Sequence, residues 1–346
     1  MSEQRRGELD DPTDNVVPFP SSSTSRSRDL APLREALREL RGEIDHRFPA
    51  GGASGLTGSA SADAKRLDWI ALFDELRERL GQLGVAERSN EVDSFGLDLM
   101  TLARAGALMD FLVDRYWRVE VRGAEGLPDA GPVVFVANHA GVIPWDGLVF
   151  AHCLARERPG WPRVRILLGD PRVTLPFAQP VLARLGVVRA CRENAERLLS
   201  QGKSVLAFPE GERGATKVFG ARYHVQRFER GCAVEAAVRR GVPLVPLGIV
   251  GAEEVHPLLF KASTVGRAIG VPFLPVTPSF PALGPLGAVP LPSKWQIEVG
   301  EPMDAGVFAA ARERDGRGTP ALEEALRDRV RALVARGLSA RGSAWR

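Results

Sequence analysis

The chain has 346 residues, of which 44% are hydrophobic and 26% charged, a composition typical of a soluble protein with a large apolar core. Its 46 Lys and Arg residues are nearly balanced by 43 Asp and Glu residues, and the net charge of +3 argues against a nucleic-acid-binding protein. The three cysteines lack metal-ligand spacing, which argues against a zinc site or a disulfide framework and favours a reducing compartment.

The N-terminal residues lack the apolar core of a signal peptide, and residues 1–28 combine Pro and Asp with a run rich in Ser and Arg. This composition predicts a disordered tail, because it cannot bury enough apolar surface to offset the entropy of ordering. No apolar run in the chain is long and proline-free enough to predict a transmembrane helix. We therefore expect a protein that meets membranes only at their surface.

A helical extension is predicted between the tail and the main domain, over residues 29–90. Leucines spaced by three and four predict amphipathic helices over 29–47 and 65–83, and a Gly-, Ser- and Ala-rich stretch over 49–62 predicts a flexible linker between them. A helical hairpin that docks on the main domain is the preferred interpretation. Self-association or binding of a partner through these two helices is the alternative.

The main domain is assigned to residues 91–346 and begins with a third amphipathic helix over 96–118. Covering the main sheet is the preferred role of this helix, and contact with a bilayer surface is the alternative. Asp110 and Asp114 on its polar face argue against the alternative.

From residue 119 onwards, short β-branched runs alternate with helical patterns, which predicts an α/β fold with a central, mostly parallel or mixed sheet flanked by helices. The predicted strands are 119–122, 133–137, 165–168, 187–188, 204–208, 244–250 and 295–299. The predicted helices are 145–156, 173–184, 192–201, 230–239, 257–268 and 320–338.

Residues 271–292 carry no charge and seven prolines. Proline removes backbone donors and kinks helices, so this segment is predicted to be an extended apolar loop. Packing over the domain is the preferred interpretation, and exposure to lipid or acyl chains is the alternative.

The first stretch with a chemical signature runs from Val133 to Gly147. A buried strand ends at Asn138 and His139, Gly141 permits a turn, and Asp146 falls in the first turn of the next helix. A histidine at a strand end that faces a carboxylate is a general base with an orienting partner. The alternative is that Asp146 only favours the helix dipole and that His139 is an ordinary loop residue.

Two further stretches predict a site for an anion. Arg192 begins a predicted helix, where a cation is unfavourable unless a carboxylate or a phosphate lies nearby. After the predicted strand 204–208, Glu210, Gly211 and Arg213 share a Gly-rich turn that is followed by Lys217. The planar guanidinium groups of arginine, together with the ammonium group of a lysine, are suited to binding phosphate. Ligands usually bind at the strand ends of an open sheet. A network of loop salt bridges between these bases and Glu210 or Glu212 is the alternative.

A fourth stretch, Val242 to Val250, is an apolar strand that contains Pro243 and Pro246. Central strands reject proline, so this strand is predicted to be bent or to lie at an edge of the sheet.

In this order, the four stretches resemble the phospholipid/glycerol acyltransferase family, of the lysophosphatidic acid acyltransferase-like kind. Its first motif, Asn-His-x4-Asp, is matched by Asn138, His139 and Asp146, and its second, Gly…Arg, by Gly186 and Arg192. Its third motif, Phe-Pro-Glu-Gly-Thr-Arg, is matched by Phe208, Pro209, Glu210, Gly211 and Arg213. Its fourth motif, Val-Pro-Ile-Val-Pro, is matched by residues 242–246. Two departures stand out: six residues instead of four separate His139 from Asp146, and Glu212 replaces the threonine. The resemblance covers about residues 96–310.

The resemblance implies an O-acyltransferase in which His139 takes the proton of an acceptor hydroxyl and Asp146 holds the imidazole. It implies a glycerolipid acceptor, 1-acylglycerol-3-phosphate being the preferred candidate and a lipid without phosphate the alternative. The acyl thioester donor would be acyl-CoA or acyl carrier protein, with no cofactor and no metal. The substrate-binding residues that it implies are Asn138, Arg192, Glu210, Gly211, Arg213 and Lys217. The expected location is cytoplasmic, peripheral on the inner face of the cell membrane.

Two functions from other classes remain as alternatives. A lipid-docking or scaffolding protein without catalysis is suggested by the widened spacing of His139 and Asp146 and by the N-terminal extension. A thioesterase or lipase is disfavoured because the chain has no Gly-x-Ser-x-Gly nucleophile elbow.

Overall fold

A computed structural model of the chain describes residues 75, 92–141, 143–169, 178–229, 231–268, 271–306 and 318–344. The predicted tail over 1–28, the predicted linker over 49–62 and the predicted helices 29–47 and 65–83 lie outside the described residues, apart from Glu75, which is helical.

In the described residues, a seven-stranded sheet has the strand order β1-β9-β6-β2-β5-β3-β4. All neighbouring strands are parallel except β6 and β9, so the predicted mostly parallel α/β sheet is confirmed. The strands are β1 (Glu120–Arg122), β2 (Val134–Ala137), β3 (Arg165–Leu168), β4 (Val187–Arg189), β5 (Val205–Ala207), β6 (Leu244–Val250) and β9 (Gln296–Val299). Each coincides with a predicted strand to within about a residue at either end. Except for β1, whose residues are half-buried or exposed, these strands are largely buried.

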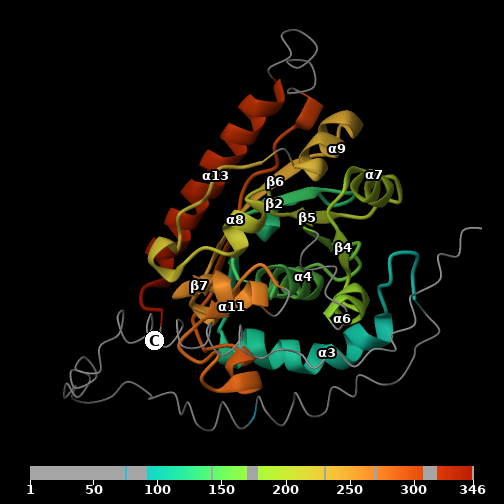
Figure 1. Cartoon of the computed structure of the whole chain (residues 1–346). Helices are drawn as coiled ribbons and strands as arrows, with labels where there is room; N and C mark the ends of the chain where they lie inside the picture. The colour runs from blue at the N-terminus through green and yellow to red at the C-terminus, as the bar shows by residue number, and fades with distance from the viewer. Residues whose placement is uncertain are drawn as a thin grey trace, which may run out of the picture. The chain divides into compact units, whose positions relative to one another are not determined.

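Alternate residues of the strands face two separate cores, because successive side chains of a strand point to opposite faces of the sheet. On one face, Phe135 and Ala137 of β2 pack in a cluster with α3 (Leu99–Phe111), the π-helix Leu112–Tyr116 and α4 (Trp145–Glu157). On the other face, Val134 and Val136 pack with α7 (Arg192–Ser200), α9 (Cys232–Arg240) and α13 (Gly318–Arg341). Helices therefore cover both faces of the sheet (Figure 1).

Shorter elements make up the rest of the described secondary structure. They are the 3-10 turns Ala124–Gly126, Phe219–Ala221 and Gly284–Ala288, the helices α6 (Ala178–Arg184), α8 (Gly211–Ala215), α10 (Ala252–Val255) and α11 (Ser263–Ala268), and the strands β7 (Phe260–Ala262) and β8 (Leu274–Val276). The predicted helix 96–118 is an α-helix from Leu99 that changes to a π-helix at Leu112. Among the described residues, no helix combines the length and the apolarity needed to span a membrane.

The predicted edge position of the Pro-containing strand is wrong. β6 lies between β9 and β2, and all seven of its residues are buried. The Pro246 carbonyl accepts from the Gly300 N–H at 2.8 Å, so the proline nitrogen faces the same side, towards the β9 segment. Regular pairing with β9 ends at Leu247 opposite Val299, and therefore the missing N–H falls where the ladder is already interrupted.

The predicted helix 257–268 is wrong in its first half, where the chain forms β7 and becomes helical only from Ser263. β7 pairs antiparallel with β8, which belongs to the proline-rich segment predicted to be a loop. Because this pairing is formed with residues about a dozen positions away, local helical spacing did not reveal it.

Candidate active site

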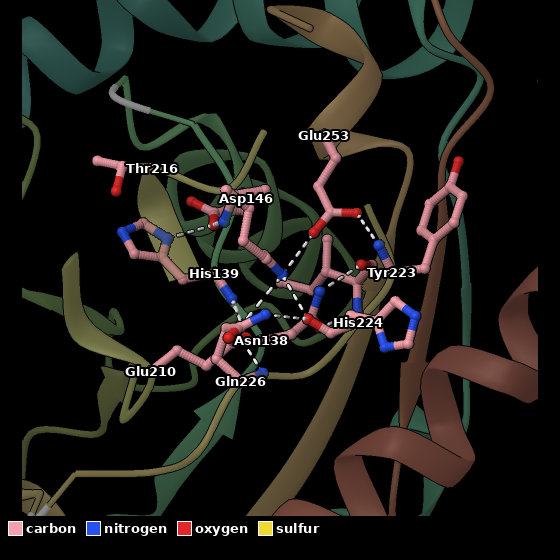
Figure 2. A network of polar contacts seen from close by, with 12 residues as sticks. Asn138, His139, Asp146, Glu210, Thr216, Tyr223, His224, Gln226 and Glu253 are labelled. Carbon is pink, nitrogen blue, oxygen red and sulfur yellow. Dashed lines mark hydrogen bonds and ion pairs between the residues drawn. The ribbon is translucent and has the colours of Figure 1, made fainter. Parts of the chain in front are cut away.

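The candidate site lies at the carboxyl ends of adjacent strands β2, β5 and β6. Asn138 and His139 follow β2, Glu210 follows β5, and Glu253 follows β6. The carboxyl ends of parallel strands meet at one edge of a sheet, so residues far apart in sequence come together there. Figure 2 shows these side chains converging from their separate segments.

The His139 ring and the Asp146 carboxylate are in direct contact: His139 Nδ1 lies 2.6 Å from Asp146 Oδ2. Both side chains are almost fully buried, 1% and 0% exposed. The same Oδ2 accepts from the Ala140 N–H at 2.9 Å, and Oδ1 accepts from the Gly147 N–H at 2.8 Å. The loop of six residues therefore closes to hydrogen-bond distance. It turns at Gly141, whose φ of 79° is left-handed and favours glycine.

The imidazole plane is fixed by packing as well as by the carboxylate. The Phe208 ring stacks on the His139 ring, with 4.1 Å between centroids and 20° between planes. Behind it, a Cβ at Gly214 would lie 3.1 Å from the Cβ of His139 and 2.6 Å from that of Glu210. Gly214 therefore permits helix α8 to approach the histidine closely.

The Glu210 carboxylate is fully buried and holds backbone on both sides of the site. Its Oε1 accepts from the His139 N–H at 2.9 Å, and its Oε2 accepts from the Gln226 N–H at 2.8 Å. The sequence predicted a Gly-rich turn here; instead the chain enters α8 at Gly211, whose φ of 58° is left-handed. Glu210 thus orders the loops around the histidine.

Lys217 is buried with two carboxylates. Its Nζ lies 2.6 Å from Glu253 Oε1 and 3.4 Å from Glu210 Oε2, and it donates to the His224 carbonyl at 3.2 Å. Burial alone would lower the pKa of Lys217, but the two carboxylates outweigh it and the pKa is raised, so the ammonium stays charged. Burial raises the pKa of Glu253 to about 7 against the opposing effect of Lys217.

Asn138 joins two strands of the sheet. Its Nδ2 donates to the Ile249 carbonyl at 2.8 Å, and its Oδ1 accepts from the Ile249 N–H at 2.8 Å. This exchange extends the β2–β6 ladder by one residue beyond its regular end at Ala137. The geometry assigns Asn138 to the framework that holds His139, and its predicted contact with a substrate stays a prediction.

Each of the three bases of the predicted phosphate site contacts a carboxylate, and their binding of a phosphate stays a prediction. Arg192 Nε donates to Glu196 Oε1 at 3.0 Å, one turn along α7, so a carboxylate offsets its unfavourable place at the helix start. Arg213 Nε lies 3.4 Å from Glu229 Oε1, and both side chains are exposed. Together with the buried pairs of Lys217, these contacts match the alternative prediction of a salt-bridge network, although Glu229, Glu196 and Glu253 are the partners in place of Glu212.

A pocket of about 200 Å³ adjoins the histidine loop. It is lined by the loop at Ala140 and Ile143 and by the proline-rich segment at Pro275 and Phe280. Most of the lining is apolar; its charged or titratable members are Lys217, Arg222, Glu253 and His256. The proline-rich segment is thus partly packed and partly exposed, with Leu283 and Leu286 the most exposed apolar side chains.

Sequence reasoning missed Glu253, Tyr223 and Arg222. Glu253 follows the end of β6 within the stretch Gly251-Ala-Glu-Glu254. Polar residues after the carboxyl ends of parallel strands are expected to meet at one edge of the sheet, and this applies to Glu253 as well as to His139 and Glu210. Tyr223 and Arg222 lie in a stretch without periodicity, and no sequence signal marks them.

The chain is similar to known proteins over parts of its length. A family model described as Acyltransferase matches residues 118–250, which include His139, Asp146, Glu210 and Lys217. An uncharacterised protein of Mycobacterium tuberculosis is 36% identical over 321 residues, which are 92% of this chain and 88% of that protein.

Two relatives with named activities match smaller parts. The 1-acyl-sn-glycerol-3-phosphate acyltransferase alpha of Ovis aries is 30% identical over 169 residues, 47% of this chain and 55% of that protein. The chloroplastic phytyl ester synthase 2 of Arabidopsis thaliana is 28% identical over 149 residues, 41% of this chain and 21% of that protein. The crystal structure of the 1-acyl-sn-glycerophosphate acyltransferase PlsC of Thermotoga maritima is similar with a TM-score of 0.44 and 18% identity, over 79% of this chain and 92% of that one.

Proposed function

Since this chain belongs to the phospholipid/glycerolipid acyltransferase family, we propose that it transfers a fatty acyl group from a thioester donor to a hydroxyl of a lipid acceptor. The single observation that carries this proposal is the buried pair of His139 and Asp146, joined at 2.6 Å at the carboxyl edge of the sheet. The same distance counts against a non-catalytic scaffold, for which side chains out of reach of each other would be expected.

The proposed reaction uses His139 as a general base. Because Nδ1 is held by Asp146, Nδ1 carries the proton and Nε2 is the nitrogen that accepts one. The acceptor oxygen attacks the thioester carbonyl carbon as its proton passes to Nε2. The C–S bond then breaks, and the thiolate takes the proton from the imidazolium, which Asp146 stabilises. The donor is acyl-CoA or acyl carrier protein, and the proposed steps need no further cofactor.

The apolar pocket beside the loop at Ala140 suits a hydrocarbon chain. Its lining by Ile143, Val218 and Phe280 favours burial of an apolar portion of the substrate. A lipid acceptor lies in a membrane, so we place the protein peripherally on the inner face of the cell membrane, where a donor made in the cytoplasm is within reach.

The acceptor has two candidates. The relative from Ovis aries acts on 1-acylglycerol-3-phosphate, as its name states, and the relative from Arabidopsis thaliana makes a phytyl ester. The charges around the histidine favour an acceptor without phosphate at this position. Asp146, Glu210 and Glu253 are three buried carboxyl groups, and Lys217 is the one buried ammonium among the described residues that contacts Glu210 and Glu253. Such an acidic cluster repels a phosphate.

The proposal is tested by incubating the purified chain with acyl-CoA and, separately, with 1-acylglycerol-3-phosphate, monoacylglycerol, diacylglycerol and a long-chain alcohol. Mass spectrometry is expected to show an ester of an unphosphorylated acceptor and the release of free CoA. Free fatty acid as the main product would indicate a thioesterase instead. Failure with every acceptor, by a folded protein and with acyl carrier protein as well as CoA donors, would contradict acyl transfer.

Substitution of Arg213 by alanine separates the two acceptors. If Arg213 bound a phosphate, its removal would raise the KM for 1-acylglycerol-3-phosphate by about tenfold or more, the loss of a charge-assisted contact. We expect instead that the KM of Arg213→Ala for 1-acylglycerol-3-phosphate stays within about twofold of that of the unsubstituted protein, since Arg213 is exposed and paired with Glu229. Arg222→Ala is the matched comparison, because Arg222 lines the pocket and stacks on Phe219. A large rise for Arg213→Ala alone would restore the phosphorylated acceptor.

A further inference from the structure

The segment Tyr223–Gln226 is linked to the backbone of His139 through Glu210 and is held by three buried side chains. Glu253 Oε2 accepts from the Tyr223 N–H, Lys217 donates to the His224 carbonyl at 3.2 Å, and Glu210 accepts from the Gln226 N–H at 2.8 Å. Figure 2 shows Glu210 and Glu253 reaching this segment from opposite ends. Since Glu210 also holds the His139 N–H, the same three side chains link the segment to the histidine backbone.

Tyr223 has a φ of 66°, in the left-handed region that a residue with a side chain rarely adopts. A conformation of this kind persists only where its surroundings impose it, and such residues gather at functional sites. Here a second buried cluster helps to hold Tyr223 in this conformation. The Tyr223 hydroxyl donates to Glu254 and accepts from Arg341 Nη2 at 2.9 Å, and Arg341 pairs with Glu254 at 2.6 Å. Adjacent glutamates of α10 thus hold the backbone and the hydroxyl of one tyrosine.

We propose that Lys217 and Glu253 are positioning residues for the acyl transfer proposed above: their ion pair holds Tyr223–Gln226 and orients Glu210, which fixes the backbone of His139. This assignment replaces the role of phosphate ligand that the sequence suggested for Lys217. The ammonium is already enclosed by two carboxylates and a carbonyl, and its side chain is 5% exposed.

The charge of Glu253 changes within the working range of pH. Burial raises its pKa to about 7, Lys217 opposes this, and the charges of Glu210 and Asp146 add to it. Arg222 and His256 line the same pocket, and burial lowers the pKa of His256, which is therefore neutral near pH 7. With a pKa of about 7, Glu253 is about one-tenth ionised at pH 6 and about nine-tenths ionised at pH 8. The ion pair of Glu253 with Lys217 and its hydrogen bond from the Tyr223 N–H therefore strengthen as the pH rises.

The test is Glu253→Gln, a change that keeps the shape of the side chain and removes its charge. The ratio of kcat for the unsubstituted protein to kcat for Glu253→Gln is expected to rise from about 1 at pH 6 to about 10 at pH 8, with the KM for the acceptor changed less than twofold. Glu235→Gln is the matched control, since Glu235 forms a surface ion pair with Arg239 on α9. Its ratio is expected to stay near 1 at every pH.

Lys217→Met is expected to lower kcat by about ten- to a hundredfold, because it leaves Glu210 and Glu253 facing each other without a cation. The double variant Lys217→Met/Glu253→Gln is expected to recover part of that loss. A ratio for Glu253→Gln that does not vary with pH would overturn the proposal, and so would a Lys217→Met variant that raises only the KM of a phosphorylated acceptor. An unsubstituted protein without activity would contradict the proposed function instead.

Discussion

Replacement of His139 by alanine is expected to lower kcat by about 10²- to 10⁴-fold, the contribution of a general base to proton transfer. The imidazole is held by Asp146 at 2.6 Å and by the Phe208 ring at 4.1 Å, so no other side chain can take its position without rearrangement. The fold should persist, because the Asp146 carboxylate keeps its bonds from the Ala140 and Gly147 N–H groups. The measurement is the rate of free thiol release from acyl-CoA, with circular dichroism as the check on folding.

His152→Ala is the matched control for this substitution. His152 also pairs with a carboxylate, its Nε2 lying 2.9 Å from Asp110 Oδ1, but this pair lies at the surface. We expect kcat for His152→Ala within about twofold of the unsubstituted value, as for most surface changes. A folded His139→Ala variant with full activity would end the assignment of His139 as the base.

The second large effect is expected from Asp146→Asn, with kcat lowered by about 10²- to 10⁴-fold, as for an orienting aspartate in other acyl transfers. Asp146 Oδ2 accepts from both His139 Nδ1 and the Ala140 N–H. An amide nitrogen at that place would face the Ala140 donor, and it would donate to Nδ1. The proton of the neutral ring would then move to Nε2, the nitrogen that must accept the acceptor proton.

Asp110→Asn changes the carboxylate of the surface pair in the same way, and we expect it to leave kcat unchanged within about twofold. The two substitutions are compared by kcat and KM at one pH, with thermal unfolding as the check on structure. An Asp146→Asn variant that stays active while His139→Ala is inactive would reduce Asp146 to a role in shaping the loop.

Much of the site was predictable because its signals are local. Strands β2, β5 and β6 are apolar runs that are followed within about three residues by a polar side chain, and strand ends of a parallel sheet converge. His139 and Asp146 are joined through a short loop at Gly141, whose closure involves only neighbouring residues. The pairing of Lys217 with Glu253 links positions far apart in the chain, and each residue alone is an ordinary charged side chain of a loop or helix start.

The sequence by itself determined the seven strands of the main sheet and the residues that follow their ends, since buried strands need apolar runs and turns need glycine. Only the tertiary structure decided what those residues contact. It placed β6 inside the sheet, where the chain after β9 leaves room for Pro246, and it paired β7 with β8. It also enclosed Lys217 between Glu210 and Glu253. The physical reason is that a buried charged side chain must be paired, and the packing of the whole chain decides which side chains are buried beside it.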